Sequence, residues 1–164
     1  MRSNEKFNVF LQIAKELNAI NIIPLLMGSV GFEIVTNRNW DAGDLDIHVP
    51  GDSRGWEAPA ETALHNWRGI MSIMGHLGYE LIDLHEHEFA KGNLSVEFGI
   101  IDTLPDFAGI QLNELEVYST DGIEYYLLSP EQYSAVYQAS SKDSYRAEKN
   151  NFKDLKKINY LKGI

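Results

Sequence analysis

The stretch LLMGSVGFEIVTNRNWDAGDLDIHVPG, residues 25–51, decides the expected fold. It opens with an apolar run that ends at Gly28 and Ser29, and near its end Asp44 and Asp46 alternate with apolar residues. Strict alternation predicts a strand that buries its apolar residues and turns both aspartates to the other face. Because aspartate is depleted in strands and two on one face concentrate negative charge, this face needs either open water or a cation.

Asp44 and Asp46 are the centre of the expected metal site. Their Cα atoms would lie about 6–7 Å apart on one strand face, so their oxygens can converge on one hard cation or a close pair. Mg²⁺ binds through one or two carboxylates, water and substrate phosphates. Glu97 in SVEFG is the expected third carboxylate, because its two neighbours are core-facing; Asp102, beyond Gly99, is the weaker rival.

Gly28 and Ser29 form the expected phosphate-binding turn. Glycine allows the backbone to approach a ligand closely, and the start of a helix expected at 30–36 presents free N–H groups to an anion. One strand end therefore offers a phosphate cradle, and the next strand offers metal ligands for the same triphosphate. A simple turn glycine is the alternative interpretation of Gly28.

The other patterns predict an α/β protein, with a mixed β-sheet flanked by helices. Apolar residues three and four apart indicate the first helix, and Ser129 with Pro130 marks the start of a later one. Pro24 either weakens its strand or places it at a sheet edge. The expected helices lie at 4–18, 30–36, 60–77 (closed by Gly78), 129–139 and 142–162, and the expected strands at 20–27, 44–49, 79–89, 94–101, 115–119 and 123–128.

At these residues the chain resembles the nucleotidyltransferase superfamily, which has the polymerase-beta-like fold. The family pattern is an apolar strand, Gly-Ser or Gly-Gly, a spacer, Asp-x-Asp on the next strand and a third acid on a later one. Here it falls on Gly28-Ser29, Asp44-Leu45-Asp46 and Glu97. DGIEYYLLSPEQY and KDSYRAEKNNFKDLKKI also resemble the C-terminal part of small bacterial antibiotic nucleotidyltransferases and related toxin- and antitoxin-type proteins, so the resemblance covers roughly residues 20–50 and 90–160.

The resemblance implies transfer of a nucleoside monophosphate from a nucleoside triphosphate to a hydroxyl. Asp44, Asp46 and Glu97 would hold Mg²⁺ or Mn²⁺, and Glu97 would also draw the proton from the acceptor hydroxyl. Metal ions in such sites neutralise charge that develops on the attacking and leaving oxygens. Gly28 and Ser29 would bind the phosphates. The alternative is a domain of the same fold without activity, which binds a nucleotide or partner protein as an antitoxin or regulator would.

The composition suits one domain over residues 1–164, with a core at about 20–128 and a helical part at about 129–164. A (β/α)₈ barrel, which needs about 200–250 residues, is disfavoured. The absence of cysteine excludes disulfides, thiolate metal sites and a cysteine nucleophile, and it fits a reducing compartment. No apolar run approaches the roughly 18 residues of a membrane span, so a soluble cytoplasmic protein is expected.

The charge is distributed unevenly along the chain. Residues 142–164 hold seven basic and three acidic residues, a charge of +4, so the net −10 leaves −14 on the first 141 residues. An acidic body argues against broad nucleic-acid binding. The sequence does not identify the acceptor substrate, which could be an antibiotic, a tRNA end, a protein side chain or a metabolite. A second copy or a partner protein could complete the acceptor site. Four basic residues spaced along one face of the last helix are expected to contact phosphate, with a solvated face as the alternative: Lys142, Arg146, Lys149 and Lys153.

Two histidine patterns remain. Asp83, His85 and His87 would share one face of the strand at 79–89, and such a trio could hold Zn²⁺ in a metal hydrolase. An exposed polar strand face is the alternative interpretation. His48 shares the face of Asp44 and Asp46, where it could order the site.

Overall fold

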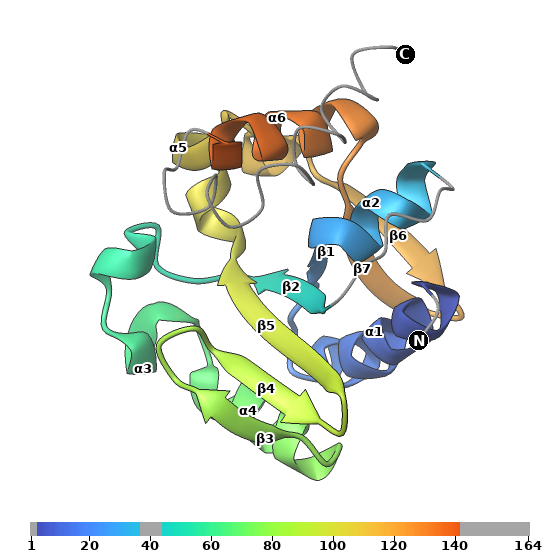
Figure 1. Cartoon of the computed structure of the whole chain (residues 1–164), viewed down its shortest axis with the longest axis vertical. Coiled ribbons are helices and arrows are strands. Elements are labelled where there is room, and N and C mark those ends of the chain that lie inside the picture. Colours follow the sequence, from blue (N-terminus) through green and yellow to red (C-terminus); the bar gives the residue numbers. More distant parts are fainter. Residues whose placement is uncertain (1–2, 37–43, 142–164) are drawn as a thin grey trace.

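The chain folds around one seven-stranded mixed sheet (Figure 1). This computed structural model describes residues 3–36 and 44–141. The strands lie side by side in the order β3-β4-β5-β2-β1-β7-β6. Their bounds are β1 Leu25–Met27, β2 Leu45–Val49, β3 Glu80–Asp83, β4 Glu88–Lys91, β5 Leu94–Ile100, β6 Glu116–Thr120 and β7 Ile123–Leu127.

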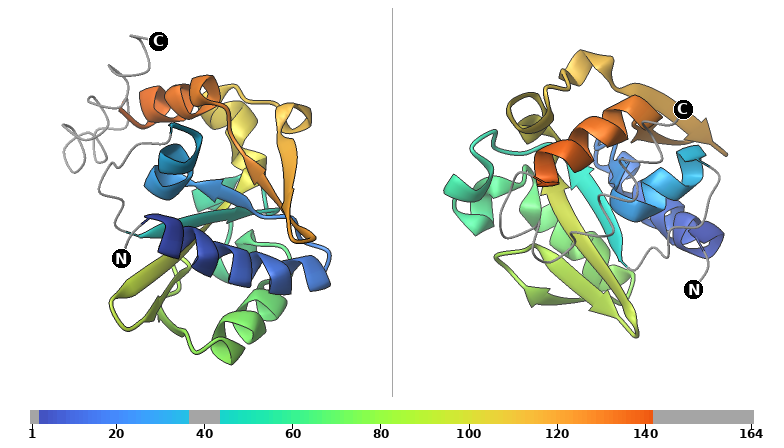
Figure 2. Two further views of the ribbon diagram at one scale, coloured as in Figure 1. Left: turned by 90° about the vertical axis from the view of Figure 1, so that its right-hand side faces the viewer. Right: turned by 45° about the horizontal axis from the view of Figure 1, so that its top comes forward.

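Helices cover both faces of this sheet. Helices α1 and α4 lie on one face, and α2, α5 and α6 lie on the other (Figure 2). The α-helices are α1 Ser3–Ala19, α2 Gly28–Thr36, α3 Ala60–Ala63, α4 Trp67–His76, α5 Leu104–Ala108 and α6 Pro130–Ser141, and the short 3₁₀ helices are η1 Gly55–Glu57, η2 Ile101–Thr103 and η3 Leu112–Glu114. The arrangement confirms the expected α/β class.

Strands β2 and β5 form the centre of the sheet and follow the alternation expected from the sequence. Along β2, Leu45, Ile47 and Val49 are buried, while the residues between them are half-buried. β5 runs parallel to β2 and has the same alternation, so its apolar residues join those of β2 in one core under α1 and α4. Every second residue of both strands therefore points to the opposite face.

A second, smaller core lies under α6 on that opposite face. Phe32 of α2 packs edge-on against Tyr133 and Tyr137 of α6. The buried Tyr133 hydroxyl donates a hydrogen bond of 2.7 Å to the carbonyl of Leu26 in β1. Burial raises the pKa of Tyr133, so this phenol keeps its proton. These contacts fix α6 over α2 and β1.

The predicted helix start at 129 is confirmed in atomic detail. The Ser129 hydroxyl accepts a hydrogen bond of 3.2 Å from the Gln132 amide, and the Gln132 side chain accepts one of 2.9 Å from the Ser129 amide. This reciprocal pair satisfies two N–H groups that would otherwise lack partners at the start of α6. The strands predicted at 115–119 and 123–128 also form, as the hairpin of β6 and β7.

The prediction for residues 20–27 is only partly right. The strand begins after Pro24, whose carbonyl accepts a hydrogen bond of 2.8 Å from the Tyr126 amide. β1 is not an edge strand, because it lies between β2 and β7. Pro24 is compatible with this central place because the missing N–H falls just outside the short ladder.

The single helix predicted at 60–77 is two helices, α3 and α4. Leu64 leaves the helix to form a β-bridge with Gly51, and Asn66 adopts a left-handed conformation. The Asn66 side chain then accepts a hydrogen bond of 3.2 Å from the Gly69 amide and caps α4. Gly78 follows the end of α4 with a φ of +93°, as expected for the residue that closes a helix.

The strand predicted at 79–89 is instead the hairpin of β3 and β4. Residues 84–87 form the turn between them, and His87 there has a φ of +50°. The last predicted helix, at 142–162, lies outside the described residues, as does the spacer at 37–43. None of the helices within residues 3–36 and 44–141 is both long and apolar enough to cross a membrane.

Candidate functional site

Asp46 and Glu97 are direct neighbours on parallel strands. The register of β2 and β5 pairs Asp46 with Glu97, between the buried pairs Leu45–Val96 and Ile47–Phe98. Because paired residues on adjacent strands point to the same face, both carboxylates leave the sheet together, on strands about 4.8 Å apart. The structure therefore brings together two of the three carboxylates that the sequence predicted.

The electrostatics of Glu97 reflect this crowding. Burial, together with the negative charges of Asp46, Glu86, Glu88 and Asp44, raises the pKa of Glu97 to about 7. A carboxyl group of this kind holds a proton up to neutral pH unless a cation arrives. A cation bound at this site would favour the charged form of Glu97.

Glu88 extends the site by one strand. The antiparallel register of β4 and β5 pairs Glu88 with Glu97, and the Ser95 hydroxyl donates a short hydrogen bond to the Glu88 carboxylate. Glu88, Glu97 and Asp46 therefore form an acidic row across β4, β5 and β2. Glu88 was not among the predicted site residues, because residues 79–89 were expected to form one strand and the register of β4 against β5 does not follow from the sequence.

Gly28 lies against Asp46 on the other side. Met27 of β1 pairs with Asp46, so the next residue begins α2 directly beside the carboxylate. Gly28 has a φ of +68°, and a Cβ there would lie 3.0 Å from Asp46 Cβ and 3.3 Å from its Oδ2. Only glycine combines this backbone angle with this close approach. Ser29 follows in the first turn of α2, as the expected phosphate-binding turn requires.

Asp44 precedes β2 and is exposed at the edge of the described residues. Its charge contributes to the raised pKa of Glu97. Within residues 3–36 and 44–141, no three His, Cys, Asp or Glu side chains form a group that could hold a metal ion among themselves. The structure therefore pairs Asp46 with Glu97, and Asp44 lies just before β2.

His48 follows Asp46 on the same face of β2. Its Nε2 lies 3.3 Å from Asp46 Oδ1. The ring spreads over Gly99 of β5, where a Cβ would lie only 2.4 Å from Nε2. His48 lies on the face of β2 predicted from the alternation. Gly99 was not among the predicted residues, although a glycine inside a strand is a signal of close approach by another group.

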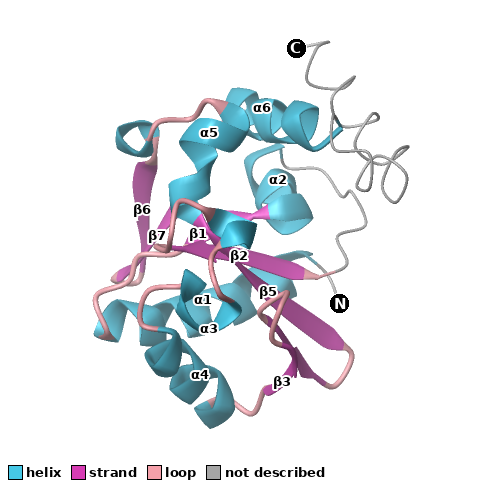
Figure 3. Cartoon of the chain, turned by 90° about the vertical axis from the view of Figure 1, so that its left-hand side faces the viewer, coloured by secondary structure: helices cyan, strands magenta, loops and turns pink. Residues whose placement is uncertain are grey.

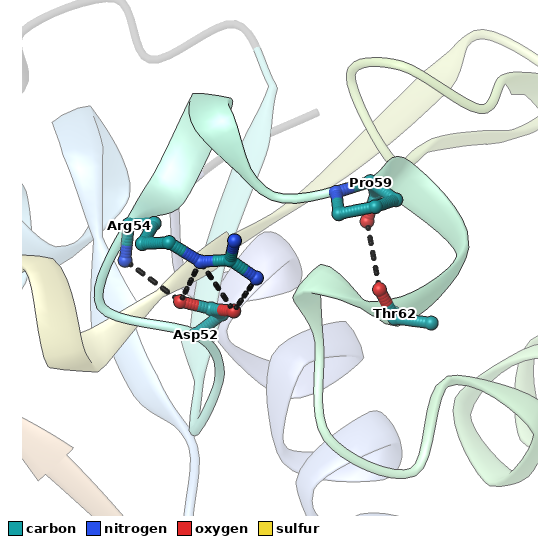
Figure 4. Close-up of polar contacts among 4 residues, drawn as sticks. All are labelled: Asp52, Arg54, Pro59 and Thr62. Carbon is teal, nitrogen blue, oxygen red and sulfur yellow. Dashed lines mark hydrogen bonds and ion pairs between the residues drawn. The ribbon is translucent and has the colours of Figure 1, made fainter.

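Asp102, the weaker rival for the third carboxylate, has a structural role. Its Oδ1 accepts a hydrogen bond of 2.8 Å from the Gly51 amide, which fixes the chain as it leaves β2. In the loop that follows, the Asp52 carboxylate accepts hydrogen bonds from the backbone amide and from the guanidinium of Arg54 (Figure 4). These hydrogen bonds lower the pKa of Asp52 to about 2.

The zinc trio considered for Asp83, His85 and His87 does not form, nor does the strand face on which both interpretations depended. Asp83 ends β3, whereas His85 and His87 lie in the turn and do not alternate on a strand. His87 is buried edge-on against Trp67, with its Nε2 2.7 Å from the Ala60 carbonyl, while His85 is exposed. The prediction was wrong because four residues of tight turn interrupt the presumed strand. His87 instead joins the β3–β4 turn to α3 and α4.

The acidic row fits Mg²⁺ better than a softer metal. Oxygen ligands predominate, and Mg²⁺ needs only one or two protein carboxylates because water and phosphates supply the rest. Burial, and after it the neighbouring carboxylates, raise the pKa of Glu97, and a bound cation would favour its charged form. Asp46 and Glu97 would hold the ion, with Asp44 as a further oxygen donor.

The four basic residues expected to meet phosphate, Lys142, Arg146, Lys149 and Lys153, lie outside the described residues. Their predicted role is therefore not tested. Of the residues expected to bind phosphate, Gly28 and Ser29 lie in the described part, at the start of α2. Figure 3 shows α2 between β2 and α6.

The fold is nucleotidyltransferase-like. The chain resembles the crystal structure of an antigenic nucleotidyltransferase-like protein from Paracoccidioides brasiliensis, with a TM-score of 0.61 over 98% of this chain and 77% of that one. The sequence identity is 15%, so this likeness shows the shared fold alone. No protein-family model matches the chain.

A much closer relative by sequence is the uncharacterized protein YnaI of Bacillus subtilis (strain 168). The two chains are 37% identical over 156 residues, which cover 94% of each. The chain belongs to the same family as YnaI.

Proposed function

We propose that the protein is a nucleotidyltransferase that transfers a nucleoside monophosphate from a nucleoside triphosphate to a hydroxyl, using Mg²⁺ or Mn²⁺. One observation carries the proposal: Asp46 and Glu97 pair across β2 and β5, directly beside Gly28 at the start of α2. Two carboxylates and a helix start within one small region suit a metal-bound triphosphate. The nucleotidyltransferase-like fold supports the same chemistry.

Each residue has a role in this proposal. Asp44, Asp46 and Glu97 would hold the metal ion, which supplies charge neutralisation on the reacting oxygens when it is bound. Glu97 would also draw the proton from the acceptor hydroxyl. Gly28 and Ser29 hold the phosphates at the start of α2. Lys142, Arg146, Lys149 and Lys153 would add contacts to phosphate from the C-terminal segment.

The finer parts of the proposal rest on the sequence resemblance. It points to the small bacterial antibiotic nucleotidyltransferases and the related toxin- and antitoxin-type proteins as the nearest functional class. The acceptor is then an antibiotic, a tRNA end, a protein side chain or a metabolite. A second copy of the chain or a partner protein would complete the acceptor site, and the reaction would take place in the cytoplasm.

The first test is a thermal-shift screen of the four nucleoside triphosphates with and without Mg²⁺. At 100 times its dissociation constant, a nucleotide should stabilise the wild-type protein by about 2.7 kcal/mol. That corresponds to a rise in melting temperature of roughly 5–11 °C for a chain of this size. We expect Mg²⁺ to be required, and we expect the double variant Asp44→Asn/Asp46→Asn to show no shift.

Asp121→Asn is the matched control for loss of negative charge. Asp121 is exposed in the β6–β7 turn with a φ of +51°, which asparagine adopts readily. This variant should keep the full nucleotide shift. A wild-type protein that shows no Mg²⁺-dependent shift with any nucleotide would refute the proposed enzyme.

The alternative is a nucleotidyltransferase-like domain without activity. One observation favours it: no three metal-binding side chains within residues 3–36 and 44–141 form a group that could hold a metal ion among themselves. Such a protein would bind a nucleotide or a partner without transferring anything. Incubation with α-³²P-labelled triphosphates, Mg²⁺ and the four acceptor classes separates the two, because only the enzyme leaves the label on an acceptor and releases pyrophosphate.

A further inference from the structure

The two carboxylate oxygens of Asp46 have different surroundings. Oδ2 lies on the side of Gly28, 3.3 Å from where a Cβ of that residue would be. Oδ1 lies 3.3 Å from His48 Nε2. The carboxylate therefore lies between the start of α2 on one side and an imidazole on the other.

The surroundings of His48 determine which ring nitrogen carries the proton. An ionised carboxylate can only accept, so a nitrogen 3.3 Å from it is favourable only as N–H. The other nitrogen, Nδ1, is buried and has no hydrogen-bond partner among the described residues. If only Nδ1 carried the proton, its N–H would be buried without an acceptor. Nε2 and Asp46 Oδ1 would then face each other as two acceptors.

Gly99 makes this placement of the ring possible. It is the register partner of His48 on β5, and a Cβ there would lie 2.4–2.8 Å from three ring atoms of His48. The imidazole thus occupies the space of a missing side chain. A ring displaced from this space would move Nε2 away from Asp46.

We propose that His48 is a positioning residue for Asp46: its Nε2–H faces Oδ1 and fixes the carboxylate, and Gly99 provides the space in which the ring lies. Only the consequence for metal binding rests on the proposed function. The outer partners of a metal ligand orient it, and their loss typically costs about 10–100-fold in metal affinity.

The position of the proton is tested directly by NMR of the ¹⁵N-labelled imidazole of His48 at neutral pH. We expect a proton on Nε2, whether or not the protein binds nucleotide. An Nε2 without a proton would overturn the proposal, because two acceptors would then face each other at 3.3 Å. This measurement is independent of whether the protein is an enzyme.

The effect on the site is tested by Mn²⁺ titration in the presence of a non-hydrolysable ATP analogue. His48→Leu removes the donor and should weaken Mn²⁺ binding by about tenfold or more. His48→Gln keeps an N–H at a similar reach and should stay within about threefold of the wild type. Equal Mn²⁺ binding by His48→Leu and the wild type would overturn the proposal.

Gly99→Ala provides an independent variant that leaves His48 in place. The added methyl group should displace the ring and weaken Mn²⁺ binding, as His48→Leu does. The double variant Gly99→Ala/His48→Leu should bind Mn²⁺ no more weakly than the weaker of the two single variants. Full additivity of the two changes would contradict the proposal. A wild-type protein that binds no Mn²⁺ refutes the proposed function instead. The NMR measurement of the proton on Nε2 then tests the role of His48 without any metal.

Discussion

Gly31→Ala should lower the free energy of unfolding by about 3 kcal/mol, which is a fall in melting temperature of roughly 6–12 °C. Gly31 lies in α2 beneath α6, and a Cβ there would lie 2.2 Å from the Tyr133 hydroxyl and 2.6 Å from the Leu26 carbonyl oxygen. The methyl group must either push α6 away or break the buried hydrogen bond between Tyr133 and Leu26. Leaving buried polar groups unpaired adds about 1–3 kcal/mol to the cost.

Gly75→Ala is the matched control. Gly75 lies in α4 and is exposed, and a Cβ there meets nothing within 4 Å. The same chemical change should therefore stabilise the protein by about 0.5–1 kcal/mol, because alanine loses less backbone entropy in a helix. Thermal or denaturant unfolding of both variants measures the contrast. Equal effects of the two changes would contradict the packing of α6 on α2.

Glu97→Gln should raise stability at pH 8 and leave it unchanged at pH 4. The pKa of Glu97 is about 7 in the folded protein, against an ordinary value of 4.5. Between pH 4.5 and pH 7, Glu97 keeps its proton in the folded state but has lost it in the unfolded state. The free energy of unfolding therefore falls as the pH rises from about 4.5 to 7. Above pH 7 the full cost of the buried charge is present, and glutamine removes it.

The expected gain at pH 8 is about 1–2 kcal/mol once screening by water is allowed for. Urea unfolding at several pH values measures it. Mg²⁺ should stabilise the wild type at pH 8 and should do much less for Glu97→Gln. Glu80→Gln, an exposed glutamate on the edge strand β3, is the control and should change stability little at any pH. A Glu97→Gln variant that is less stable than the wild type at pH 8 without metal would contradict the crowding of negative charge at this residue.

Sequence patterns predicted the centre of the fold well. The alternation of β2 and of β5 is a strong signal, because a shift of one residue would expose every buried side chain of the strand. The same alternation placed Asp46 and Glu97 on the polar face. Their direct pairing could not be predicted, because it depends on the register between strands separated by about fifty residues of sequence.

The errors have a common physical cause. The break between α3 and α4 and the turn between β3 and β4 use Asn66 and His87 in left-handed conformations, with neither glycine nor proline at those positions. Sequence patterns locate turns mainly by glycine and proline, so both were passed over. The hairpin error also concealed the place of Glu88 in the acidic row.

Titration of Mn²⁺ into the protein with a non-hydrolysable ATP analogue, followed by electron paramagnetic resonance, tests the central proposal most directly. We expect the wild type to bind Mn²⁺ with the nucleotide, and we expect both Asp46→Asn and Glu97→Gln to lose most of that binding while remaining folded. Asp102→Asn should retain it, because Asp102 binds the Gly51 amide and lies outside the acidic row. Wild-type Mn²⁺ affinity in both Asp46→Asn and Glu97→Gln would contradict the assignment of the metal site to this pair.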